Sequence, residues 1–551
     1  MKMKQFIVAV AVMATAFGVH AQTLEDGIKM YNYERYKSAK KILEPLADKT
    51  PLANYYLGLV ELKLGRKDVA RTIFLKQPDN YANMGGLARV SFAEGNSAQG
   101  MQLASALAGK AKKKEWEPLK YAADAITYTE GGDIQQAIGW YKAALSVYDN
   151  LDMRLSLGDA CLKLPGGGGE AADNFDRVVA KDPKNSMAYT RIGQLFYSAR
   201  NYKVAQENWE KAKEADQNNP IPWGDLADAY TAVGKYDLAR THIEKYLELS
   251  DNTDTDMEKY MDILFLSKNY KDAAAKAQEL VDGGKPKVRY YGILAFSLLE
   301  LKDSASCVKA LKYARDYFSK QEAAKIFPDD YRKYGRILLC NNLAAEANTY
   351  FTKAVEIDTA KNKSAAYREN AEALRLAKEW IPAATWYERV INEYPADATG
   401  NDYFYAPFCR YYTREITEYE NAFKGFKLMK EKYPKEPSPA YWCGRAAAAI
   451  DNEAKDGTAV PYYEEWLNME TPSTYTRKPA DLMQAYQYLL IYYYNKGESE
   501  KTKNYIEKIN TIEPGNALAK QIEDLLKSGS KAKVNPSGSK LATKPAAKPK
   551  K

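Results

Sequence analysis

Residues Met187–Leu249 contain two units that repeat one pattern of apolar and small residues, the second following the first by 34 residues. The marker residues of the first unit are Tyr189, Ile192, Gly193, Phe196, Tyr202, Ala205, Trp209 and Ala212, and those of the second are Trp223, Leu226, Ala227, Tyr230, Tyr236, Ala239, Ile243 and Tyr246. A fixed period of this length is typical of chains built from stacked supersecondary units. Within each unit the apolar residues have helical spacing in two groups separated by a short turn, which predicts a helix hairpin.

Small residues stand where the two predicted helices of a unit must approach each other closely. They are Gly193 and Ala205 in the first unit and Ala227 and Ala239 in the second, whereas large apolar residues fill the space between the helices. This pattern resembles the tetratricopeptide repeat (TPR). The resemblance extends over residues 25–526 and implies an all-α, TPR-type solenoid or superhelix of about 13–14 helix hairpins. It also implies a binding role without naming the partner.

The repeat frame divides the chain into five parts. We expect a signal peptide at residues 1–21, N-terminal TPR-like units at 22–109, central TPR units at 110–326, and C-terminal TPR units with a closing helix at 327–527. Residues 528–551 form a Lys-rich tail. The closing helix is expected to cover the last apolar face, which has no following unit to pack against.

The first residues have the features of a secretory signal. Lys2 and Lys4 precede an apolar run from Phe6 to Phe17, and small residues stand at the cleavage spacing before Gln22. The run is too short to span a bilayer, and no other stretch is long and apolar enough. We therefore expect a periplasmic protein without a transmembrane span, with association with the outer membrane as a further expectation. The Gln after the cleavage point and the 44 tyrosines make the chain similar to exported proteins of the Bacteroidetes.

The formal net charge of +8 arises at the two ends of the chain. Removing the two lysines of the signal and the seven of the tail leaves a net charge of −1 for the repeats. This balance lacks the positive excess of nucleic-acid-binding proteins, so we exclude a nucleic-acid partner. The tail combines lysines with Ser, Gly, Ala and Pro, and we expect it to be disordered. Its role is either to solubilise this end or to attract anionic envelope components.

Five cysteines in an exported chain raise the question of disulfides. Cys409 and Cys443 have equivalent places in the first helices of neighbouring units, where packed helices lie about 8–10 Å apart, beyond disulfide reach. Cys161, Cys307 and Cys340 also fall on predicted apolar helix faces. We therefore interpret all five as small buried apolar residues.

The mature chain is expected to hold a single histidine, which limits its catalytic chemistry. His20 belongs to the signal, so His242 is the one histidine that remains, which excludes Ser-His-Asp and Cys-His catalysis and most zinc sites. Gly166–Gly169 resembles a phosphate-binding loop, but no Gly-Lys-Ser/Thr follows, and we interpret it as a turn. Leu482–Gln484 is similar to a tripeptide of lytic transglycosylases, whose catalytic Glu-Ser is missing here. We expect no enzyme activity, cofactor or metal.

In the TPR resemblance, the inner groove is lined by first-helix positions one, five and eight residues after the residue that opens each unit. In the C-terminal units these positions and their neighbours are Arg332, Arg336, Arg368, Arg375, Tyr411, Arg414, Tyr441, Arg445 and Tyr494. Arginine binds carboxylate or phosphate through paired hydrogen bonds, and tyrosine adds rigid contact area. The stripe predicts a protein or peptide partner with an acidic segment or a free carboxylate. The alternative is that these arginines pair with acids of neighbouring helices.

Two functions fit this sequence. The first is an exported non-catalytic scaffold that binds envelope proteins or peptide segments through its concave face. The alternative is binding of an envelope glycan or peptidoglycan, which requires exposed platforms of tyrosines and tryptophans outside the repeat frame. Two tripeptides that begin at Asp303 and Asp358 resemble the short O-glycosylation motif of exported Bacteroidetes proteins. They imply candidate glycans on Ser304 and Thr359, between predicted helices.

Overall fold

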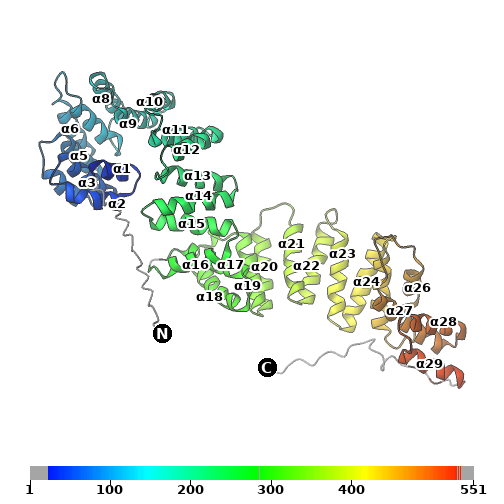
Figure 1. The fold of residues 1–551 in the computed structure, drawn as a ribbon. Helices are drawn as coiled ribbons and strands as arrows, with labels where there is room; N and C mark the ends of the chain where they lie inside the picture. The colour runs from blue at the N-terminus through cyan, green and yellow to red at the C-terminus, as the bar shows by residue number, and fades with distance from the viewer. Residues whose placement is uncertain (1–22, 285, 530–531, 533, 535–551) are drawn as a thin grey trace, which may run out of the picture. The chain divides into compact units, whose positions relative to one another are not determined.

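The computed structural model describes residues 23–284, 286–529, 532 and 534. Within them the regular secondary structure consists of 29 α-helices and two short 3-10 helices, so the predicted all-α fold of helix hairpins is confirmed. The chain forms two compact units, one ending at Lys276 and the other beginning at Ala277. This boundary falls inside the group of repeats predicted for residues 110–326. In each unit the hairpins follow one another in sequence order (Figure 1).

The N-terminal unit contains fifteen complete α-helices. They are α1 (Leu24–Asn32), α2 (Tyr36–Leu43), α3 (Pro51–Lys63), α4 (Lys67–Leu75), α5 (Tyr81–Ala93), α6 (Ser97–Ala108), α7 (Glu117–Thr127), α8 (Ile134–Val147), α9 (Leu151–Leu162), α10 (Gly168–Lys181), α11 (Ser186–Ser198), α12 (Tyr202–Ala215), α13 (Ile221–Ala232), α14 (Tyr236–Leu249) and α15 (Asp254–Leu266). The 3-10 helix η1 (Glu44–Leu46) follows α2, and α16 (Tyr270–Asp282) crosses the boundary between the units.

The C-terminal unit continues the same alternation of first and second helices. They are α17 (Val288–Glu300), α18 (Ser304–Lys320), α19 (Pro328–Cys340), α20 (Ala344–Ile357), α21 (Ser364–Leu376), α22 (Trp380–Glu393), α23 (Gly400–Tyr412), α24 (Ile416–Lys432), α25 (Pro437–Ile450), α26 (Val460–Asn468), α27 (Pro479–Lys496), α28 (Ser499–Ile512) and α29 (Ala517–Lys527). The 3-10 helix η2 (Ala323–Lys325) precedes α19, and α29 packs on α28 and α27 as the expected closing helix.

Each hairpin pairs a first helix with the second helix that follows it, as α11 pairs with α12 and α13 with α14. Side-chain caps stabilise the starts of several of these helices. At the start of α11, the Asn185 side chain accepts a hydrogen bond from the Ala188 N–H at 3.0 Å. First helices of neighbouring hairpins also contact one another, for example α3 with α5 and α5 with α7. First helices therefore share one side of the stack, as the repeat pattern predicts.

A residue in the left-handed backbone region stands two positions before the second helix of most hairpins. Glycine fills this place at Gly65, Gly95, Gly234 and Gly497, and other residues with φ of 59–63° fill it at Arg200, Lys268, Lys302, Asn342, Lys378 and Arg414. This turn corrects the prediction for Arg414. Helix α23 ends at Tyr412, and α24 already begins at Ile416, so Arg414 is the left-handed turn residue and not a position on a first helix.

Glycine in a first helix makes room for an aromatic ring of the second helix. A Cβ added to Gly193 would lie closer than 3.0 Å to the ring of Trp209, which is 2% exposed. The same close approach occurs between Gly58 and Phe74, Gly158 and Phe175, Gly335 and Phe351, and Gly444 and Tyr463. The absence of a side chain at one position thus sets the distance between the two helices of a hairpin.

Gly193→Ala should lower the free energy of unfolding by about 1–3 kcal/mol, because the added methyl group overpacks against Trp209. Gly139 in α8 is a matched control, since nothing lies within 4 Å of a Cβ added there. Gly139→Ala should raise the free energy of unfolding by about 0.5–1 kcal/mol through helix propensity. Thermal unfolding followed by circular dichroism measures both changes. A Gly193→Ala variant as stable as the wild type would contradict the assigned contact.

The N-terminal unit also closes on itself through its first hairpin. Asp216, after α12, accepts a hydrogen bond from the Tyr33 hydroxyl at 2.7 Å. Asp251, after α14, accepts from the backbone N–H groups of Lys37 and Ser38 at 2.6 and 3.0 Å and thereby caps α2, which lacks a side-chain cap of its own. These bonds join residues 183 to 214 positions apart, so the hairpin α1–α2 packs on α3, its neighbour in sequence, and also contacts the segments after α12 and α14.

The interpretation of all five cysteines as unpaired is wrong for two of them. Cys307 in α18 and Cys340 at the end of α19 form a disulfide with Cα atoms 6.3 Å apart. One stands on a second helix and the other on the first helix of the next hairpin, so the spacing of equivalent first-helix positions does not apply to this pair. Cys161, Cys409 and Cys443 are free and buried, as expected.

The described residues include none of the predicted signal peptide and little of the predicted tail at the two ends of the chain. The predicted signal peptide, residues 1–21, lies outside the described residues, as does most of the predicted disordered tail. Within the tail, Ala532 and Val534 are described, and both form hydrogen bonds with α27. Every helix in the described part of the chain is too short or too polar to cross a lipid bilayer.

Candidate functional site

The nine predicted groove residues lie in the C-terminal unit, and all except Arg414 stand on first helices. Arg332 and Arg336 are on α19, Arg368 and Arg375 on α21, Tyr411 on α23, Tyr441 and Arg445 on α25, and Tyr494 on α27. The repeat register therefore places them on equivalent helices. Their partners within the chain decide which of them remain available to another molecule.

Four of the predicted arginines form ion pairs with carboxylates of this chain. The pairs are Arg332 with Glu369 at 3.3 Å, Arg336 with Glu300 at 3.1 Å, Arg368 with Asp402 at 2.9 Å and Arg375 with Glu372 at 2.6 Å. Three of these acids belong to a first helix of a neighbouring hairpin and one to the same helix. Arg332, Arg336 and Arg368 therefore agree with the alternative that the arginines pair with acids of neighbouring helices. Arg375 is neutralised within its own helix.

Arg368 has a further structural role. It donates hydrogen bonds to both oxygens of Asp402, at 2.9 and 3.0 Å. The Asp402 side chain is 1% exposed and also accepts from the Thr399 N–H at 2.8 Å, which caps the start of α23. Removal of Arg368 would leave this carboxylate buried without a cation. Arg368 therefore holds α21 against the start of α23.

Arg445 differs from these four arginines. It forms no ion pair with any described residue, and its buried Nε has no hydrogen-bond partner. Its guanidinium lies 4.4 Å from the ring centre of Trp442 and 5.1 Å from that of Tyr411. Cation–π contacts hold the group in place, but they supply no counter-charge. The structure thus contains, at Arg445, a partly buried positive charge that no carboxylate of the described chain neutralises.

Tyr419 of α24 lies beside Tyr411 of α23. Its ring centre is 5.1 Å from that of Tyr411. Burial raises the pKa of the Tyr419 hydroxyl, and the positive charges of Arg414 and Arg445 oppose this rise, which indicates that both guanidinium groups lie near it. We call Tyr411, Arg414, Tyr419, Trp442 and Arg445 the Arg445 cluster. The groove positions of the repeat do not include Trp442 and Tyr419, since Trp442 follows the groove position Tyr441 by one residue and Tyr419 stands on a second helix.

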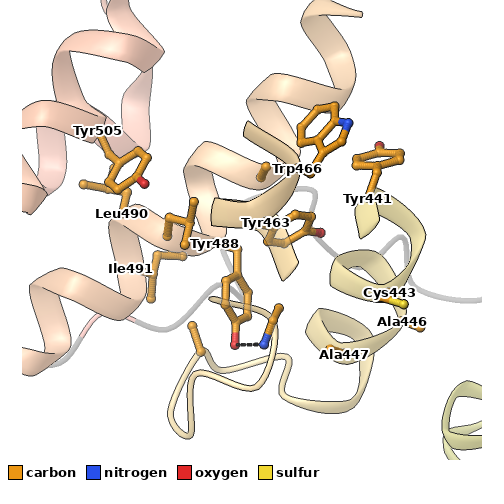
Figure 2. Close-up of a cluster of buried hydrophobic side chains, with 14 of the residues drawn as sticks. Tyr441, Cys443, Ala446, Ala447, Tyr463, Trp466, Tyr488, Leu490, Ile491 and Tyr505 are labelled. Atoms are coloured by element: carbon orange, nitrogen blue, oxygen red, sulfur yellow. Dashed lines mark hydrogen bonds between the residues drawn. The ribbon is translucent and has the colours of Figure 1, made fainter. Parts of the chain in front are cut away.

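Tyr441 supports this cluster from the core. It is 4% exposed, and its ring centre lies 4.6 Å from that of Trp466. Figure 2 shows the two rings next to each other. Its hydroxyl donates to an oxygen of Asp481 at 2.5 Å. The prediction placed Tyr441 in direct contact with a partner, whereas the structure buries it where α25 packs against α26 and α27. Its role is to hold α25 in position.

The inner helices of the N-terminal unit carry a network that sequence reasoning did not single out. The Asp124 carboxylate accepts hydrogen bonds from Lys120 and from the Tyr141 hydroxyl, each at 2.6 Å. Arg89 lies 3.9 Å from the same carboxylate. The signal was the presence of charged residues inside otherwise apolar first helices, α5 and α7. Asp228 on α13 forms an ion pair with Lys259 on α15 at 2.8 Å.

Asp225 on α13 has a carboxyl group whose pKa is strongly raised by its surroundings. Burial raises the pKa of its carboxyl to about 7; a hydrogen bond from Gln194 at 3.0 Å opposes the rise, and the negative charges of Asp228 and Glu34 add to it. The folded pKa thus lies above the unfolded value, near 3.9. The folded state binds the proton more strongly, so stability falls as pH rises from about 4 to 7.

Asp225→Asn should remove this pH-dependent cost. We expect the melting temperature of the variant to exceed that of the wild type at pH 8, where Asp225 is ionised, and to equal it at pH 4, where it is protonated. Glu248→Gln is the control, because the Glu248 side chain is 64% exposed. An equal shift for Asp225→Asn at both pH values would show that ionisation of Asp225 is not the cause.

The structure shows the surroundings of His242 and of the Gly166–Gly169 segment. His242 is 8% exposed, its Nδ1 lies 2.8 Å from the Leu238 carbonyl oxygen, and burial lowers its pKa. In the part of the chain that is described, no group of His, Cys, Asp and Glu side chains is arranged to hold a metal ion. The Gly166–Gly169 segment forms the turn before α10, in which Gly166 has a φ of 78°. These residues have packing and turn roles.

A cavity of about 340 Å³ lies between α22, α23 and α24. Pro407, inside α23, and Gly425 form part of its wall. Arg410 also lines it and donates hydrogen bonds to Glu388 at 2.5 Å and Glu418 at 2.6 Å. Its cation is therefore neutralised by two acids of the chain. The sequence signal for this cavity was a proline inside a predicted helix.

Exposed aromatic rings do not gather as the glycan alternative requires. The large exposed aromatics of the described residues are Tyr128, Tyr148, Tyr202 and Phe327. Tyr148 follows α8, Tyr202 opens α12 and Phe327 precedes α19, so these three rings belong to separate hairpins. Ser304 and Thr359, the candidate glycosylation sites, are both exposed. Thr359 lies between α20 and α21, as expected, whereas Ser304 is the first residue of α18 and does not lie between helices. Modification of either residue stays a prediction.

Comparison with known proteins gives distant relatives. No protein-family model matches the chain. Over 374 residues it is 23% identical to a TPR repeat-containing protein of Methanocaldococcus jannaschii, covering 61% of this chain and 58% of that protein. Over 164 residues it is 26% identical to a probable UDP-N-acetylglucosamine–peptide N-acetylglucosaminyltransferase, SPINDLY, of Hordeum vulgare, covering 28% and 16%. The chain thus spans less than two thirds of the length of these curated relatives.

Among solved structures, the C-terminal part of a TPR repeat-containing protein from Cytophaga hutchinsonii is 26% identical, with a TM-score of 0.37. The match covers 48% of this chain and 98% of that one. Each 34-residue sequence repeat within residues 187–249 forms one helix hairpin, and successive hairpins stack on one another. The chain is thus similar in sequence to a TPR repeat-containing protein, and it has the all-α architecture of helix hairpins that the TPR resemblance implies.

Proposed function

We propose that this TPR protein is an exported, non-catalytic scaffold that binds an acidic peptide segment or a free carboxylate of an envelope protein at the Arg445 cluster. The observation that carries the proposal is the guanidinium of Arg445, which has no ion pair among the described residues and an unpartnered Nε. Trp442 and Tyr411 hold it at fixed distances of 4.4 and 5.1 Å. A preorganised cation loses little conformational entropy on binding an anion.

Electrostatics favours binding of a partner's carboxylate at Arg445 over binding at the other predicted arginines. Arg332, Arg336, Arg368 and Arg375 would have to exchange an existing carboxylate for a partner's. Arg445 makes no such exchange, and Arg414 is exposed on the neighbouring turn. A hydrogen bond to a charged group contributes about 1.5–3 kcal/mol when it is made without replacing another. Binding energy should therefore concentrate at Arg445.

Arg445→Met should weaken binding of acidic peptides by about 10-fold to 100-fold, because it removes the charge and keeps an apolar side chain on Trp442. The probes are fluorescent peptides that end in Asp or Glu, each compared with its amidated and Gln/Asn-substituted form by fluorescence anisotropy. Arg375→Met is the matched control and should change affinity little, since Arg375 is paired with Glu372 at 2.6 Å. Equal affinity of wild type and Arg445→Met, or equal loss in the two variants, would rule out the Arg445 cluster.

Export is supported by two features of the chain. The first residues resemble a secretory signal, and the disulfide between Cys307 and Cys340 is typical of proteins in oxidising compartments. The protein recovered from the periplasmic fraction of its host should therefore begin at Gln22, as measured by intact mass spectrometry. A mass above that of residues 22–551 by the weight of a glycan would support modification at Ser304 or Thr359. An intact Met1 in the native protein would exclude export through this signal.

A further inference from the structure

The segment that follows the last helix lies against α27 at two described residues. The Tyr494 hydroxyl donates a hydrogen bond to the Ala532 carbonyl oxygen at 3.0 Å. The Asn495 side chain donates to the Val534 carbonyl oxygen at 3.2 Å and accepts from the Val534 N–H at 3.3 Å. The Val534 side chain is 4% exposed and belongs to the core cluster of the C-terminal unit. Three hydrogen bonds and one buried side chain thus hold a segment that the sequence predicts to be free tail.

The geometry at Asn495 is that of peptide recognition. Its amide satisfies both the donor and the acceptor of one backbone residue, which is how a neighbouring β-strand binds an extended chain. Such contacts read the backbone and tolerate different side chains, whereas the buried position of Val534 selects an apolar residue. Tyr494 occupies a groove position of the repeat register, so these contacts lie on the first helix of the last complete hairpin.

We propose that Tyr494, Asn495 and the apolar surface around Val534 form a binding site for extended peptides, and that the chain's own tail is its tethered occupant. A partner for this site offers an extended segment with a valine-like residue, which has to displace Val534. Because Val534 follows the end of α29 by only seven residues, its effective concentration is on the order of mM. The tail therefore excludes weak ligands and admits strong or multivalent ones. This site lies on α27 and is separate from the Arg445 cluster.

The test uses the full chain and a fluorescent peptide with the sequence of residues 529–538. Val534→Asp in the full chain should empty the site, because a carboxylate cannot be buried there without a partner. We expect this variant to bind the peptide at least about tenfold more tightly than the wild type, whose site is occupied. Val534→Ile is the matched control and should bind as weakly as the wild type. A chain ending at Gly529, which retains every helix, should bind like Val534→Asp.

A second substitution identifies the site. Asn495→Leu in the Val534→Asp background should abolish peptide binding with helix content unchanged, since it removes both backbone hydrogen bonds. Arg445→Met in the same background should leave peptide binding intact, which separates this result from the scaffold function proposed above. Failure of both the Val534→Asp variant and the chain ending at Gly529 to gain affinity over the wild type would overturn the proposal. So would undiminished binding after Asn495→Leu.

Discussion

The contact between a small residue of a first helix and a large residue of its second helix is the constraint on which each hairpin depends. At Gly193 the missing side chain allows the Trp209 ring to lie against the helix backbone. The same close packing of an aromatic ring against a glycine recurs at Gly58, Gly158, Gly335 and Gly444. Because each hairpin is fixed internally in this way, its exposed apolar face can be buried only by the next hairpin, and the fold grows by repetition. Function then depends on what the shared first-helix face presents.

The repeat made the fold predictable, since a period in sequence becomes a period in space. Features that join different hairpins were not predictable from it. The disulfide between Cys307 and Cys340 links a second helix to the next first helix, a relation that comparison of equivalent positions does not test. Arg414 is not part of the predicted first-helix stripe, because α23 ends at Tyr412 and α24 begins at Ile416. The position of such a turn does not alter the pattern of apolar marker residues. The hydrogen bonds of Asp216 and Asp251 with the first hairpin depend on the curvature of the stack of hairpins in the N-terminal unit. This curvature is the sum of small rotations between successive hairpins.

The repeat period also predicted which helix positions line the groove, but not which of the arginines at these positions are paired within the chain. Four of the six predicted arginines are neutralised by acids of this chain, and the repeat pattern does not distinguish an arginine that pairs with an internal carboxylate from one that binds an external carboxylate. Arg445 is distinguished by its surroundings: Trp442 and Tyr411 pack on its guanidinium where a neighbouring first helix could have supplied an acid. An aromatic residue in the repeat frame is normally counted as core, so this environment becomes visible only once the side chains are placed. Tyr441 shows the reverse, a predicted contact that stabilises the core.

The closure of the N-terminal unit has a consequence for the order in which the chain folds. Stacked repeats normally complete their contacts with neighbours in sequence, so folding can spread from any point along the chain. Here α2 receives its N-terminal cap from Asp251, more than 200 residues later. During synthesis the hairpin α1–α2 emerges first, yet its last hydrogen bonds must await α14. The first segment to leave the ribosome is therefore among the last in its unit to reach its final environment, and the loop-closure entropy of that contact makes the unit cooperative from end to end.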